Sequence, residues 1–222
     1  SNNVNTYLCS QVLFKIHPNF DKIMNSILEK DKNGVLIFIK MNVGKYIQDI
    51  LINRLSRTLG ENITRVHFID WQTCEREYYK LLSIADVIID PHPFGGCNTS
   101  FSAFGMGIPI ITYPAKLING RFTYGLYKKM GIMDLVVDND EDYIRMAIKC
   151  GTNKEYRKKI SEKIYENILK IFNDIDSIKS WTKFCILSVN DKLENKNCII
   201  INNDIEDINK IENSNIKMIS YE

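Results

Sequence analysis

A short polar stretch with two glycines, residues 95–100, carries the residue types best suited to binding an anion. Gly95 and Gly96 are followed by an Asn-Thr-Ser triplet at 98–100, and an apolar run at 87–89 precedes the stretch. Asn, Thr and Ser are favoured at helix starts, because their side chains accept hydrogen bonds from the first backbone N–H groups. A glycine loop that opens a helix after a parallel strand presents N–H groups and the positive end of a helix dipole. That combination suits a phosphate or pyrophosphate.

The same pattern also fits a plain turn between a strand and a helix. Neither the dinucleotide fingerprint G-x-G-x-x-G nor the nucleoside-triphosphate fingerprint G-x-x-x-x-G-K-[ST] occurs in this stretch. Spacing alone therefore leaves two interpretations open, a phosphate-binding loop and a turn with only a structural role.

Apolar runs and amphipathic segments alternate along the chain and would position this loop. A mixed aromatic and aliphatic segment at 7–16 comes first, and Pro18 then begins a helix. The predicted strands are 35–39, 65–69, 87–89, 108–113 and 135–137, and the predicted helices are 46–59, 74–82, 120–130, 141–149, 154–172 and 178–189. The alternation predicts an α/β fold, a Rossmann-like parallel sheet flanked by helices.

Two motif blocks carry a resemblance to a known family. The first is D-P-x-P-F-G-G-x-N-T-S at 90–100, and the second is G-x-G-I-P-I-I-T-Y-P at 105–114, followed by Arg121 and Gly131. Together with the segment 10–18, these blocks resemble the O-linked N-acetylglucosamine transferase family, which includes the SPINDLY-type enzymes. The resemblance implies a GT-B glycosyltransferase, of which this chain would be the C-terminal, donor-binding half.

The resemblance also implies which residues bind the donor nucleotide. Gln11 and Lys15 match contacts to the diphosphate and the sugar, and Lys15 would stabilise the leaving group. The implied loop and cleft positions are Gly95, Gly96, Cys97, Asn98, Thr99 and Arg121. Ser102 falls where the family carries an acidic residue that binds the ribose, so a neutral Ser is a departure there. Glu75 and Tyr78 fall where animal members carry a lysine and a histidine near the nucleotide.

The activity that the resemblance implies is transfer of N-acetylglucosamine from a UDP-sugar to Ser or Thr of a protein or peptide acceptor. Transfer would proceed with inversion and without a metal or another cofactor. The acceptor site and the catalytic base would belong to an N-terminal lobe that this chain lacks. Three alternatives stay open: a degenerate nucleotide-binding module without transferase activity, a transferase that uses another donor such as GDP-fucose, and a nucleotide-sugar epimerase of the same two-domain architecture.

The composition is that of an ordinary soluble domain. The 222 residues carry a formal net charge of +2, which gives no electrostatic footprint for nucleic acid or a membrane surface. The six cysteines are scattered without C-x-x-C pairs, which argues against structural zinc and fits a reducing compartment. We therefore expect a cytoplasmic protein, with the nucleus as a second location.

The chain is expected to divide near its C-terminus. Residues 7–188 would form the nucleotide-sugar-binding domain. Residues 189–222 are rich in Asn, Asp and Ile, in repetitive phrases such as INNDIEDINKIENSN, and are predicted to be a low-complexity tail.

Overall fold

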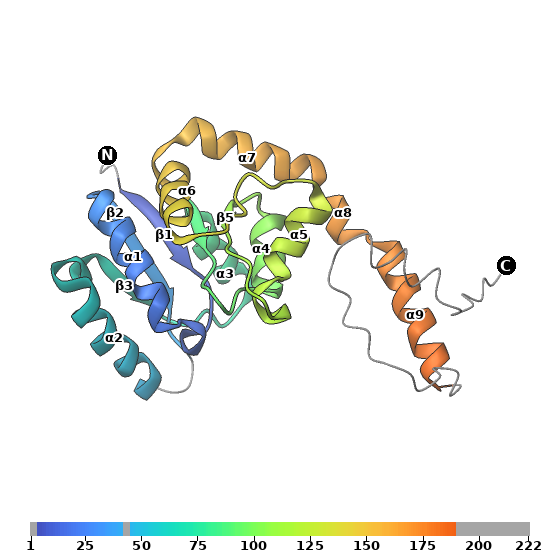
Figure 1. Cartoon of the computed structure of the whole chain (residues 1–222), viewed down its shortest axis with the longest axis horizontal. Coiled ribbons are helices and arrows are strands. Elements are labelled where there is room, and N and C mark those ends of the chain that lie inside the picture. The colour runs from blue at the N-terminus through green and yellow to red at the C-terminus, as the bar shows by residue number, and fades with distance from the viewer. Residues whose placement is uncertain (1–3, 42–44, 190–222) are drawn as a thin grey trace. The chain divides into compact units, whose positions relative to one another are not determined.

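The computed structural model describes residues 4–41 and 45–189 (Figure 1). The chain divides into two units, Ser1–Asp174 and Ile175–Glu222. Almost all of the second part of the predicted division, the tail at 189–222, lies outside the described residues. None of the helices in the described ranges is both long and apolar enough to cross a membrane.

The first unit is built on a five-stranded sheet in which every pair of neighbouring strands is parallel. The spatial order is β3-β2-β1-β4-β5. The strands are β1 (Asn5–Cys9), β2 (Gly34–Ile39), β3 (Val66–Ile69), β4 (Val87–Ile89) and β5 (Ile110–Ile111). The side chains of β1, β2, β4 and β5 are mostly buried, as expected for a sheet covered on both faces, whereas those of the edge strand β3 are only partly buried or exposed.

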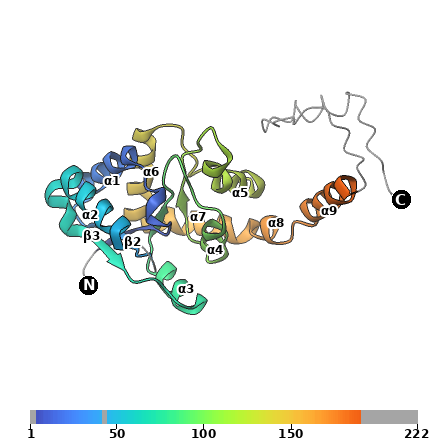
Figure 2. The ribbon, with the colours of Figure 1, turned by 90° about the horizontal axis from the view of Figure 1, so that it is seen from below.

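Helices connect successive strands and cover both faces of the sheet (Figure 2). Right-handed crossovers put α1 (Pro18–Lys30) and α2 (Lys45–Leu59) on one face, and α3 (Glu75–Ser83) and α4 (Asn98–Gly105) on the other. Helix α6 (Asp140–Thr152) packs beside α1 and contacts β1 and β4. The remaining elements are the 3₁₀ turns η1 (Leu13–Lys15), η2 (Gly60–Arg65) and η3 (Ile118–Gly120), and the helices α5 (Phe122–Met130), α7 (Lys154–Asn167) and α8 (Leu169–Phe172).

Three expectations from the sequence need correction. The strand predicted over 108–113 is only the two residues of β5, and the outer strand predicted at 135–137 is reduced to a single bridge between Val136 and Thr112. The helix predicted over 154–172 is two helices, interrupted where the Asn167 side chain donates to the Lys163 carbonyl. In each case periodicity located the element, but tertiary contacts decided its length.

The second unit contributes one described helix, α9 (Ile175–Val189). Trp181 and Phe184 lie on one of its faces with ring centroids 5.7 Å apart, and both side chains are at least half exposed. The amphipathic pattern predicted for 178–189 is therefore present as a helix.

Candidate functional site

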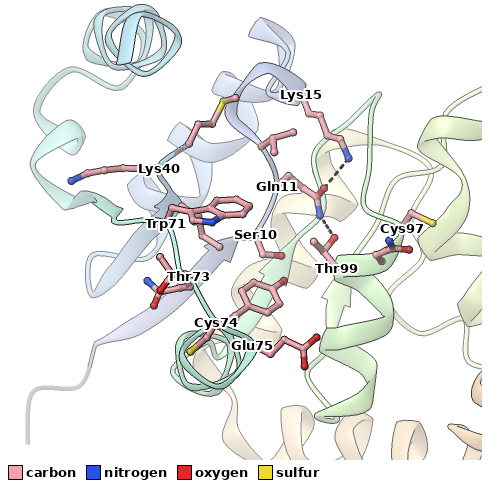
Figure 3. Close-up of a pocket in the computed structure, with 16 residues that line it drawn as sticks. Ser10, Gln11, Lys15, Lys40, Trp71, Thr73, Cys74, Glu75, Cys97 and Thr99 are labelled. Carbon is pink, nitrogen blue, oxygen red and sulfur yellow. Dashed lines mark hydrogen bonds between the residues drawn. The ribbon is translucent and has the colours of Figure 1, made fainter. Parts of the chain in front are cut away.

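A cavity of about 630 Å³ opens at the carboxyl ends of the central strands (Figure 3). The chain leaves β1 and β4 towards opposite sides of the sheet, which is where open α/β sheets bind ligands. The volume is within the usual range of small-molecule sites. The lining residues are Ser10, Gln11, Val12, Lys15, Ile39, Lys40, Met41, Trp71, Gln72, Thr73, Cys74, Glu75, Tyr78, Cys97, Asn98 and Thr99.

The ammonium group of Lys15 lies at one end of the cavity, where hydrogen bonds fix its position. Lys15 Nζ donates to Gln11 Oε1 at 3.0 Å and to the Gly95 carbonyl at 3.1 Å, and it lies 4.4 Å from the centroid of the Phe94 ring. Gln11 Nε2 in turn donates to Thr99 Oγ1. Burial lowers the pKa of Lys15 from its ordinary value. A partly buried ammonium group is a suitable partner for an anionic ligand.

The first turn of α4 faces the same end of the cavity. Cys97 is the N-cap residue and makes no capping hydrogen bond through its side chain. The amides of Asn98 and Thr99, the first two of the helix, have no hydrogen-bond partner within the described part of the chain. The triplet 98–100 does begin a helix, as the sequence predicted, but Cys97 takes the N-cap position and the expected capping by the triplet's side chains is not observed. Ser100 Oγ bonds Thr123 Oγ1 at 2.8 Å instead.

The amides of the two glycines are already occupied. Gly95 N donates to the Asn119 carbonyl at 3.1 Å, and Gly96 N donates to Asp90 Oδ1 at 2.7 Å. The expectation that the glycine loop presents free N–H groups is therefore corrected, and the free donors are those of α4. A Cβ on Gly96 would lie 2.6 Å from Gln11 Nε2, so this glycine allows the close approach of loop and side chain.

Asp90 fixes the loop to the sheet. Its carboxylate accepts from Gly96 N on one side and from Thr112 Oγ1, at 2.9 Å, on the other. Burial raises the pKa of Asp90, and these hydrogen bonds partly offset the rise. The carboxylate lies behind the loop rather than in the cavity, so it supports the site without lining it.

Two predicted site residues, Ser102 and Arg121, lie away from both this cavity and the glycine loop beside it. Ser102 lies one turn further along α4, in a separate depression with Phe101 and Phe172. Arg121 donates to the Ala115 carbonyl at 2.9 Å and lines a second cavity that opens beside Tyr124. The remaining predicted residues, Gln11, Lys15, Gly95, Gly96, Cys97, Asn98 and Thr99, come together at the first end of the main cavity or in the loop beside it.

Residues that follow the carboxyl ends of β2 and β3 line the opposite side of the cavity. Trp71, which follows β3, is 47% exposed, and Lys40, which follows β2, pairs with Asp70 at 2.6 Å. Trp71 was not among the residues predicted to form the site. Its position directly after a parallel strand was the available signal, because the carboxyl ends of such strands meet at one edge of the sheet.

No group of three or more His, Cys, Asp or Glu side chains in residues 4–41 and 45–189 is arranged to hold a metal ion. The chain has three Asp-x-Asp sequences, at 138–140, 140–142 and 174–176, and none of them lines the main cavity.

Gly120 permits the loop to pack against η3, and its replacement gives a test of that packing. A Cβ at Gly120 would lie 2.2 Å from the Pro93 carbonyl oxygen, a backbone atom that can move only with the loop. We expect Gly120→Ala to lower the free energy of unfolding by about 2 kcal/mol. Gly125→Ala, on α5 with nothing within 4 Å of the added Cβ, is the control and should stabilise by about 0.5–1 kcal/mol. Equal urea midpoints for the two variants would contradict the assigned close approach.

Comparison with known proteins gives distant relatives that are named as protein glycosyltransferases. The chain is 25% identical over 154 residues to a probable UDP-N-acetylglucosamine–peptide N-acetylglucosaminyltransferase SPINDLY of Eustoma exaltatum subsp. russellianum, covering 69% of this chain and 17% of that protein. It is 22% identical over 155 residues to a UDP-glucose:protein N-beta-glucosyltransferase of Actinobacillus pleuropneumoniae serotype 5b, covering 69% and 24%. The chain thus spans less than a quarter of the length of these relatives.

Solved structures agree on the fold. A mutant of the Thermobaculum terrenum O-GlcNAc transferase superposes with a TM-score of 0.66 at 24% identity, covering 76% of this chain and 32% of that one. An Escherichia coli structure, described as trehalose-6-phosphate bound with UDP-2-fluoro glucose, gives a TM-score of 0.54 at 16% identity, covering 76% and 41%. These likenesses show the α/β architecture of the GT-B glycosyltransferases.

The decisive match is to a family as a whole. The model of glycosyl transferase family 41 matches residues 2–183, which include the whole sheet and the cavity. The chain therefore belongs to glycosyl transferase family 41.

Proposed function

We propose that this chain is the donor-binding portion of a protein O-glycosyltransferase and that its cavity binds a UDP-sugar, UDP-N-acetylglucosamine. The observation that carries the proposal is the convergence of Lys15 Nζ with the free amides of Asn98 and Thr99 at one end of the cavity. A cation beside a helix N-terminus suits a diphosphate. The Trp71 end offers an aromatic surface for the base.

The same arrangement supports the expected chemistry. When the acceptor hydroxyl of Ser or Thr attacks the anomeric carbon, the bond from that carbon to the β-phosphate oxygen breaks and UDP leaves. The hydroxyl proton passes to a base. Lys15 and the first turn of α4 would stabilise the negative charge that develops on the leaving diphosphate, without a metal. Inversion follows from a single displacement of this kind.

The cavity accounts only for the donor side of the proposed reaction. The relatives are four or more times longer than the matched region, so we assign the protein acceptor site and the base to a further lobe. A cytoplasmic location, with the nucleus as a second one, is part of the same proposal.

Titration calorimetry with UDP and with GDP tests the donor assignment. We expect UDP to bind with at least about tenfold higher affinity than GDP, because a pyrimidine and a purine differ in the edges they present to the Trp71 end. Tighter binding of GDP would favour the alternative of a GDP-sugar donor. No binding of either nucleotide would contradict the proposal for this chain.

A further inference from the structure

The backbone turn that carries Lys15 is short and needs support from other elements. Turn η1 has three residues. One backbone hydrogen bond runs from Lys15 N to the Val12 carbonyl at 3.1 Å, and the next runs from Ile16 N to the Leu13 carbonyl at 3.2 Å. Hydrogen bonds in a 3₁₀ turn have poorer geometry than those of an α-helix, and such turns occur in short pieces. The position of the Lys15 backbone therefore depends on what holds the end of this turn.

A side chain from helix α2 holds the residue directly after Lys15. Arg54 Nη2 donates to the Ile16 carbonyl at 2.7 Å. Ile16 precedes His17, the N-cap residue of α1, so its carbonyl lies outside the hydrogen-bond ladder of that helix, which begins at the His17 carbonyl. Ile16 is buried, and a buried carbonyl needs a donor. Arg54 supplies that donor and ties the end of η1 to α2.

A buried carboxylate fixes the same guanidinium group. Arg54 Nε donates to Asp21 Oδ2 at 2.7 Å, and Arg54 Nη2 donates to Asp21 Oδ1 at 2.9 Å. Asp21 lies in the first turn of α1, where burial raises its pKa and the hydrogen bonds from Arg54 partly offset the rise. Because the carboxylate binds the guanidinium at two points, it sets the plane of the group. Arg54 therefore fixes the junction of η1 and α1 through three hydrogen bonds.

Arg54 acts from behind the donor site. It lies on α2, which packs against α1 and η1, and it does not line the main cavity. Lys15, one residue before Ile16, extends from this junction to the cavity, where its Nζ donates to the Gly95 carbonyl. The distance from the ammonium group to the free amides at the start of α4 therefore depends on where the junction holds η1.

We propose that Arg54 is a positioning residue of the donor site, which holds Lys15 at the place where its ammonium group and the first turn of α4 can bind one diphosphate together. The inference rests on the proposed nucleotide-binding function and assigns part of its phosphate recognition to a residue outside the cavity. Arg54 touches no ligand in this arrangement and acts through Lys15.

The test compares the binding of UDP and uridine to the full chain and to Arg54→Lys by titration calorimetry. Lysine keeps the positive charge but replaces the planar fork with a single ammonium group, so it cannot bind Asp21 and the Ile16 carbonyl with the same geometry. We expect Arg54→Lys to bind UDP about fivefold more weakly, while its affinity for uridine changes by less than about twofold. In a Lys15→Ala background the same substitution should change UDP affinity by less than about twofold, because the group that Arg54 positions is gone.

Arg65→Lys is the matched control. The Arg65 guanidinium, at the end of η2, also joins several segments, since it donates to the carbonyls of Leu28, Asp31 and Gly34. Gly34 begins β2, so these hydrogen bonds lie at the edge of the sheet away from the cavity. Arg65→Lys should therefore change the affinity for either ligand by less than about twofold. Urea unfolding of both variants compares the stability that each substitution removes.

The ligand dependence separates positioning from a general loss of structure. Equal losses of UDP and uridine affinity in Arg54→Lys, or the same loss of UDP affinity in Arg65→Lys, would overturn the inference. A full loss of about fivefold in the Lys15→Ala background would also overturn it, because Arg54 would then act independently of Lys15. If the wild type binds no UDP, the proposed function fails and the inference fails with it. Asp21→Asn weakens the same junction from α1 and is read in the same way if Arg54→Lys does not fold.

Discussion

Lys15→Ala is expected to weaken UDP binding by about 10- to 100-fold, while uridine binding changes by less than about twofold. The ammonium group lies at the anion-binding end, on hydrogen bonds to Gln11 and the Gly95 carbonyl, and away from the Trp71 end. Its removal should therefore weaken only the contacts to the phosphates. Calorimetric titration with both ligands measures the difference. Lys22→Ala, which removes an exposed lysine of α1 outside the cavity, is the control.

The pH dependence of binding checks the same role. Burial lowers the pKa of Lys15, so in the free protein the lysine loses its proton below its ordinary pKa of 10.5. UDP affinity should be highest below this lowered pKa and should fall as the pH rises through it. Lys15→Arg keeps its charge over that range and should give a flat profile. Equal losses of UDP and uridine affinity in Lys15→Ala would rule out a phosphate contact.

Asp90→Ala is expected to lower the free energy of unfolding by about 3 kcal/mol. The substitution leaves two buried donors, Gly96 N–H and the Thr112 hydroxyl, without the acceptor they share. The glycine loop then loses its attachment to the sheet, and UDP affinity should fall together with stability. Urea unfolding measures the first effect. Asp49→Ala, an exposed position on α2, should change stability by less than about 0.5 kcal/mol.

Asp90→Asn separates the hydrogen bonds from the charge. Because burial raises the pKa of Asp90, its stabilising contribution is complete below about 3.8 and is lost as the pH rises through the raised pKa. The asparagine variant keeps an acceptor for Gly96 but has no such titration. Its stability relative to the wild type should therefore improve as the pH rises through that window. A constant difference between the two proteins would show that Asp90 does not titrate with a raised pKa.

Much of the fold follows from local pattern. The apolar runs at 35–39, 65–69 and 87–89 became the strands β2, β3 and β4, and Gly131, with φ of 77°, ends α5 where the sequence predicted. These features depend on the periodicity of apolar residues and on the ability of glycine to adopt a positive φ. Both can be recognised in a single sequence. The family resemblance was likewise confirmed, because its motifs lie in contiguous stretches.

The details of the site depended on contacts between distant residues. The glycine amides are satisfied by Asp90 and Asn119, and Ser100 turns to Thr123 rather than capping its own helix. Gly95 and Ser100 find partners in a distant segment, and Gly96 finds one at the start of its own loop. These pairings depend on how the loop packs, so propensity for a cap or a free loop could not reveal them. The roles of the individual donor-binding residues stay predictions that the titrations above address.

The strand order also has a consequence for how the protein folds. Strand β1 is in register with β2, where Cys9 lies opposite Phe38, and also with β4, where Tyr7 lies opposite Val87. Pairing β1 with β2 closes a short loop of chain. Pairing β1 with β4 closes a much longer loop, which contains β2, β3 and their helices, and so costs more conformational entropy. Pairing across β1, β2 and β3 can therefore precede the docking of β4. Because the cavity spans the junction of these two parts, with Gln11 from one and Thr99 from the other, we expect it to be among the last features of the native state to form.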